Sequence, residues 1–136
     1  MKLPLLLLAC LPLLGGAALF EHYALSRQRI QFRVDAAAAH GAHALAEGRN
    51  IEAEVRRRLA EIPVLKPGDR IEIETPPGTG RYRGWRTAVR VRVGQPWSPP
   101  LIPRRLADKL PLDVSATAVA VAPGPRHPEP VALRVE

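Results

Sequence analysis

The chain has little cysteine and few aromatic residues, and each shortage excludes a class of protein. Its single cysteine, Cys10, cannot form an internal disulfide or a cysteine-based zinc site. Aromatic residues make up 4% of the sequence, too few for the base-stacking sheet of an RNA-recognition module. With 136 residues the chain is also too short for a dinucleotide-binding fold or a TIM barrel. The sequence therefore predicts one small domain at most.

Arrangements of residues that carry chemistry are also missing. The sequence contains no nucleophile–base–acid set and no glycine-rich phosphate loop. His40 and His43 have a spacing that suits a metal, but no third ligand accompanies them. We therefore expect no enzyme, and no catalytic, cofactor-binding or metal-binding residues.

The formal net charge is +7, and arginine supplies nearly all of it. Such a charge favours anionic surfaces. Because the excess arginine accompanies much alanine and proline, it is typical of biased codon usage, and the total alone does not indicate nucleic-acid binding.

The most distinctive segment is Leu3–Phe20, which carries no charge. As a helix it is about 27 Å long, close to the ~30 Å hydrocarbon thickness of a bilayer. A cleaved signal peptide is the alternative, but no Ala-x-Ala site occurs before Ala36. Leu7–Cys10 approximates a lipoprotein motif, yet apolar residues continue after the cysteine. We therefore predict an uncleaved transmembrane signal anchor over residues 1–20, which contacts lipid through residues 3–20.

The charges around this segment do not decide its orientation. Lys2 precedes it, whereas Arg27, Arg29 and Arg33 follow it.

Residues 21–47 lack proline and are rich in alanine, which predicts a helix that continues from the anchor. Its second half offers a face of small side chains between Ala36 and Ala46, where a neighbouring helix or sheet can approach closely. Gly48 ends this helix and Asn50 caps a second one. Ile51, Val55, Leu59 and Ile62 form the apolar face of the second helix, and Pro63 ends it.

The run Arg56–Arg58 lies on the polar face of this second helix. Glu52 with Arg56, and Glu54 with Arg58, have the i,i+4 spacing of favourable ion pairs. We therefore interpret the arginine run as a solvated, partly paired surface.

Beyond residue 70 the period of the hydrophobic pattern changes to two. Arg70–Thr75 and Ala88–Val93 alternate strictly, and Leu112–Val121 reads as a final, largely buried strand. A short helix is expected over Arg104–Leu110. The fold class is therefore α+β, with a small antiparallel sheet of about three strands. We divide the chain into an anchor (1–20), an α+β domain (21–122) and a proline-rich, unstructured tail (123–136).

The arginines around the second strand allow two interpretations. If Ile71 and Ile73 face the core, Glu72 and Glu74 share the outer face with Arg90 and Arg92, and cross-strand ion pairs are expected. The alternative is an anion site for DNA or an acidic glycan. It would use a basic stripe in which two aromatic residues are interleaved: Arg81, Tyr82, Arg83, Trp85, Arg86, Arg90 and Arg92. We favour the ion pairs.

Residues 27–38 resemble the N-terminal signature of the TadE/TadG-like proteins, membrane-anchored components of Flp (tight adherence) pilus assembly. In that family an apolar anchor and a basic turn lead into a Leu-Gln-Asn-Ala-Ala-Asp-Ala-Ala-Ala-like run. Ile30, Gln31, Asp35 and 36–38 match this run, whereas 32–34 depart from it. The segment 114–120 is similar to the closing strand of the family.

The resemblance implies a single-pass inner-membrane protein whose pilin-like α+β domain is exported. It implies a minor pseudopilin or assembly factor that acts by contacts with other pilus subunits. The small-residue helix face is then a candidate for partner contact or self-association. The alternative function is an exported envelope protein that binds an anion through its basic strand.

Overall fold

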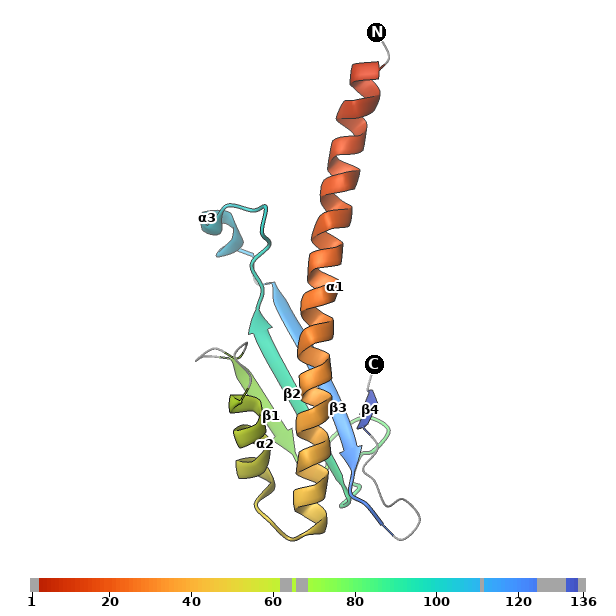
Figure 1. Ribbon diagram of the computed structural model, residues 1–136, viewed down its shortest axis with the longest axis vertical. Coiled ribbons are helices and arrows are strands. Elements are labelled where there is room, and N and C mark those ends of the chain that lie inside the picture. Colours follow the sequence, from red (N-terminus) through yellow and green to blue (C-terminus); the bar gives the residue numbers. More distant parts are fainter. Residues whose placement is uncertain (1–2, 62–64, 66–68, 111, 125–131, 135–136) are drawn as a thin grey trace.

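The computed structural model describes residues 3–61, 65, 69–110, 112–124 and 132–134, with side chains described from Cys10 to Gly124 within these ranges. A single helix, α1 (Leu3–Ala46), runs the length of the molecule, and a sheet and a second helix pack around its C-terminal half (Figure 1). The N-terminal half projects beyond the sheet. The expected α+β class, with a long first helix and a short second one, is confirmed.

No helix within the part of the chain whose side chains are described is long and apolar enough to cross a membrane. The side chains of residues 3–9, which begin the expected anchor, lie outside the described residues.

The second helix, α2 (Ile51–Ala60), begins where the sequence predicts. Asn50 accepts a hydrogen bond from the backbone N–H of Ala53 at 3.0 Å, which satisfies one of the free donors at the helix start. Val55 and Leu59 are buried against α1. Ile62 and Pro63, with which the sequence ends this helix, lie outside the described residues.

The sheet is antiparallel, and its strands follow one another in chain order: β1 (Arg70–Glu74), β2 (Ala88–Pro96), β3 (Asp113–Val121) and β4 (Ala132–Arg134). Short α3 (Arg104–Ala107) lies in the β2–β3 connection and ends before the expected Leu110. Helix α1 covers the inner face of the sheet, mainly over β2 and β3. Alternate residues of these strands, Val89, Val91 and Val93 with Ala116, Ala118 and Ala120, form the core with α1.

The structure adds a fourth strand to the antiparallel sheet of about three that the sequence predicts, and this strand lies in the tail that the sequence predicts to be unstructured. Ala132–Arg134 pairs with Ala118–Ala120 at the far edge of β3. The proline-rich composition describes the connection before this strand, not the strand itself. An open sheet edge offers unpaired backbone groups, and a short alternating segment such as Ala132–Arg134 can pair with them.

Candidate functional site

The residues of the family-like motif bind α1 to its own sheet. Ile30 is 6% exposed, and Ala37 and Ala38 are fully buried. The amide Nε2 of Gln31 donates to the backbone oxygen of Thr117 at 2.8 Å, and it also donates to Asp35 at 2.8 Å. Thr117 precedes the part of β3 that β4 covers. The polar motif residues therefore join the helix to the sheet edge.

The small-residue face of α1 is occupied inside the molecule. Ala37, Ala38, Ala42 and Ala44 are buried, and Gly41 lies against Val55 of α2 and Val89 of β2. The sequence analysis offers this face for self-association, but the sheet and α2 of the same chain cover these four alanines and Gly41. Ala36 and Ala39 are half-buried and Ala46 is exposed, so only these members of the face are accessible to a partner.

One such surface is the face of α1 that points away from the sheet. Leu14, Leu25 and Phe32 are 68%, 47% and 76% exposed. Steps of eleven and seven residues separate them, close to three and two whole helical turns, so all three lie on one side of the helix. Ile30 and Val34, which are buried under the sheet, lie on the opposite side. We call Leu14, Leu25 and Phe32 the outward stripe.

The predicted cross-strand ion pairs are confirmed. Glu72 is opposite Arg92 and Glu74 is opposite Arg90 in the β1–β2 register. The carboxylate–guanidinium distances are 3.3 Å for Glu72–Arg92 and 2.9 Å for Glu74–Arg90. Two of the arginines in the alternative anion site are thus paired with glutamates.

The two pairs differ in their exposure, which the sequence does not predict. The Arg90 side chain is 4% exposed, against 48% for Arg92. The loop after β1 folds over Arg90, and Thr79 accepts hydrogen bonds from both terminal guanidinium nitrogens, at Oγ1 and at its backbone oxygen. Gly80 follows with φ of 82°, and a Cβ there would lie 2.9 Å from Arg90 Nη2. Glycine therefore allows the loop to close over the guanidinium.

A hollow of about 330 Å³ lies beside this pair. It is lined by residues from α1, the β1–β2 loop and the sheet: Arg27, Gln31, Thr79, Gly80, Arg90, Arg92, Ser115 and Thr117. Two of its three arginines are paired, Arg90 with Glu74 and Arg92 with Glu72. The third, Arg27, makes no hydrogen bond or ion pair within the described residues. Most of the positive charge in the hollow is therefore compensated.

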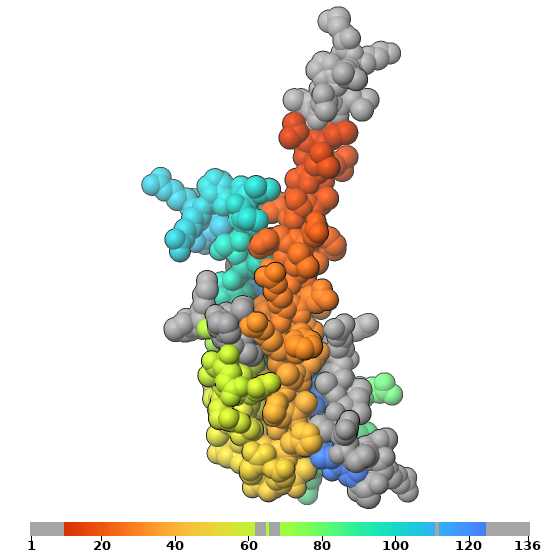
Figure 2. Space-filling model, viewed as in Figure 1, coloured from red at the N-terminus to blue at the C-terminus, as the bar shows by residue number. Residues whose placement is uncertain are grey.

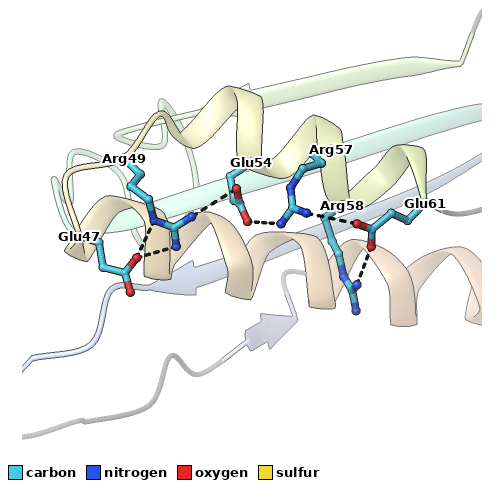
Figure 3. A network of polar contacts seen from close by, with 6 residues as sticks. All are labelled: Glu47, Arg49, Glu54, Arg57, Arg58 and Glu61. Atoms are coloured by element: carbon cyan, nitrogen blue, oxygen red, sulfur yellow. Dashed lines mark hydrogen bonds and ion pairs between the residues drawn. The ribbon is translucent and has the colours of Figure 1, made fainter.

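The arginine run of α2 forms ion pairs, but one of them differs from the prediction. Glu52 pairs with Arg56 at 2.9 Å, as the spacing predicts. Glu54 does not pair with Arg58. It contacts Arg57 at 2.7 Å and Arg49 at 3.3 Å, while Arg58 turns to Glu61 (Figure 3). Two other arginines reach the Glu54 carboxylate instead of Arg58: Arg57, at the i+3 position, and Arg49, in the turn between the two helices.

Acid should weaken this network through Glu54. The hydrogen bond from Arg57 lowers the pKa of Glu54 below its usual 4.5, and the charges of Arg57, Arg49 and His40 act in the same direction, while burial opposes them. A pKa that is lower in the folded state stabilises the fold above about 4.5, and this contribution is lost as the pH falls through the folded-state pKa.

Glu54→Gln should therefore reduce the free energy of unfolding at neutral pH and flatten its decline in acid, measured by urea titration at a series of pH values. Glu52→Gln makes the same charge change on the same helix and serves as the control. An acid profile for Glu54→Gln that matches the unsubstituted chain would contradict this assignment.

Within the described residues, no group of three or more His, Cys, Asp or Glu side chains is arranged to hold a metal ion. Cys10 is a free thiol of intermediate exposure.

Comparison with known proteins adds no relative: no family model, curated protein or solved structure matches this chain at a significant level.

Proposed function

We propose that this protein is a non-enzymatic, membrane-anchored component of Flp pilus assembly, a minor pseudopilin or assembly factor that acts by protein–protein contacts. Leu3–Phe20 anchors it in the inner membrane, and the pilin-like domain stands on the extracytoplasmic side. The support for anchoring is the uncharged sequence of this segment, together with its continuation into a helix that carries the whole domain.

The observation that carries the proposal is the shape of α1. It is one continuous helix of 44 residues. The sheet packs against its C-terminal half, whereas its N-terminal half projects beyond the sheet (Figure 1). The outward stripe places exposed apolar side chains on both halves. A helix that lies partly outside its own domain can pack lengthwise against helices of neighbouring subunits, with the outward stripe at the contact.

The alternative, an anion-binding envelope protein, has less support. Its two strand arginines pair with Glu72 and Glu74, and Arg90 is covered by the loop at Thr79. Among the described residues that line the hollow, an anion would find one arginine without an acidic partner, Arg27. We therefore favour assembly over anion capture.

The experiment has two parts. In the first, the full chain should remain in the membrane pellet after carbonate washing, and a C-terminal reporter should be active only outside the cytoplasm. A full-length product found free in the cytosol would contradict the proposal.

The second part tests the outward stripe. Phe32→Asp should abolish co-purification with the other pilus-assembly subunits without loss of membrane association. Trp85→Asp provides the control, because Trp85 is also an exposed aromatic residue, 50% accessible, but lies in the β1–β2 loop. Equal losses from the two substitutions would exclude the stripe as the contact surface.

A further inference from the structure

The connection between β2 and β3 forms a side lobe, which we define as residues 97–112, with residue 111 outside the described part. The lobe leaves the top of the sheet and extends along α1 toward the N-terminus (Figure 1). Its base is closed by the backbone hydrogen bond from Trp97 N to Leu112 O at 2.7 Å. The space-filling view shows it protruding beside the bare part of α1 (Figure 2).

The surface of the lobe combines leucines with basic residues. Leu101, Leu106 and Leu110 are 66%, 55% and 49% exposed, and it is their grouping on one short connection that is informative. Three exposed basic residues stand among them, Arg104, Arg105 and Lys109, against one acidic residue, Asp108. Leucines beside uncompensated bases are typical of a surface that enters the interface of an anionic bilayer.

The position of the lobe along α1 also fits a contact with an anionic bilayer. Trp97 packs edge-on against Tyr23 with ring centroids 5.2 Å apart, and it lies 6.1 Å from the His22 ring. If the proposed anchor sets the hydrocarbon boundary at Phe20, where the uncharged segment ends, Tyr23 is three residues, about 4.5 Å, beyond it. The headgroup layer is roughly 5–7 Å thick on each side of a bilayer. Tyr23 and Trp97 therefore lie at the depth where tyrosine and tryptophan concentrate in membrane proteins.

We propose that the lobe docks on an anionic phospholipid surface. Its exposed leucines enter the upper acyl region, and Arg104, Arg105 and Lys109 bind headgroup phosphates. This inference rests on the proposed anchoring of Leu3–Phe20 and extends it. The helix alone allows the domain to rotate and tilt, whereas a second contact away from the helix axis sets the orientation in which the outward stripe meets a partner.

The test places a fluorophore on the lobe of the full chain. A Cys10→Ser, Leu106→Cys chain carries an environment-sensitive dye and is reconstituted into vesicles of phosphatidylcholine and phosphatidylglycerol that contain lipids brominated on the upper acyl chain. We expect a blue-shifted emission and strong quenching by the brominated lipid. The same dye on Arg83→Cys, an exposed site in the β1–β2 loop, should show neither.

Charge reversal tests the basic residues. In a triple variant that carries Arg104→Glu, Arg105→Glu and Lys109→Glu, the lobe should leave the membrane surface. Each basic residue contributes about fivefold to binding at an anionic membrane. The quenching at residue 106 should then fall to the level of the Arg83 site, as it should for the parent chain in pure phosphatidylcholine at high salt. Reversal of Arg81, Arg83 and Arg86 makes the same change in net charge away from the lobe and should have no effect.

A dye on native Cys10, read in vesicles whose lipids are brominated near the ends of the acyl chains because Cys10 is near the middle of the anchor, separates this inference from the anchoring. Lipid quenching at Cys10 without quenching at residue 106 would overturn the docking and leave the anchor standing. No lipid quenching at Cys10 would overturn both. Protection of residue 106 from aqueous iodide without brominated-lipid quenching would assign the lobe to a protein partner, which also overturns the proposal.

Discussion

Gly41→Ala is expected to destabilise the protein by about 1–2 kcal/mol, although alanine is the better helix former by about 1 kcal/mol. A Cβ at this position would lie 2.8 Å from Val55 Cγ2 and 3.2 Å from Val89 Cγ1. Both valines are fully buried and branch at Cβ, so neither can rotate away freely. The added methyl group would have to push α2 or β2 away from α1. Urea unfolding of the full chain in mild detergent, followed by circular dichroism, measures the effect.

Two controls isolate the steric cause. Gly16→Ala also changes a helical glycine, but nothing lies within 4 Å of a Cβ there, so stability should stay the same or rise. Val55→Ala removes the atom that the new methyl group meets. The double variant should therefore lose less than the sum of the two single losses. Strict additivity would show that Gly41 is not held by close packing.

The second large effect is expected at the covered ion pair. Glu74→Ala should cost about 2 kcal/mol, because it leaves the Arg90 guanidinium buried without its carboxylate. The cost stays below that of a fully buried pair since the Glu74 side chain is 39% exposed and water can take its place. Urea midpoints at constant slope would report this loss.

The neighbouring pair is the matched control. Glu72→Ala removes the same group from the same strand, but its partner Arg92 is 48% exposed, so the loss should be below about 1 kcal/mol. Arg90→Met in the Glu74→Ala background should recover much of the stability, because an apolar chain replaces an unpaired charge. Equal losses at Glu72 and Glu74 would mean that the loop does not shield Arg90.

The strand pairing was predictable because it depends on alternation. Once Ile71 and Ile73 face the core, the register that buries Val91 and Val93 also sets Glu72 opposite Arg92 and Glu74 opposite Arg90. The start of α2 was predictable for a similar reason, since the cap at Asn50 depends on residues within one turn. In both cases the residue pattern of the segments themselves is enough for the prediction.

The sequence analysis differs from the structure where the answer depends on which element lies against a given surface. The tail strand Ala132–Arg134 forms on β3 because that edge is open, and composition does not reveal an open edge. The small-residue face of α1 reads as a partner surface until α2 and β2 are seen to cover it at Gly41. A run of alanines predicts that another element can approach the helix closely, but it does not predict whether that element belongs to the same chain or to a partner.

By itself, the sequence determined the helix and strand periods, the uncharged stretch Leu3–Phe20 and which charges share a strand face, because each depends on neighbours a few residues apart. Tertiary structure alone decided that Thr79 covers Arg90 while Arg92 stays in solvent, and that Trp97 brings the lobe level with Tyr23. These differences arise from contacts between distant segments. The burial of a side chain and its position along α1 depend on what the rest of the chain places nearby, which no local pattern encodes.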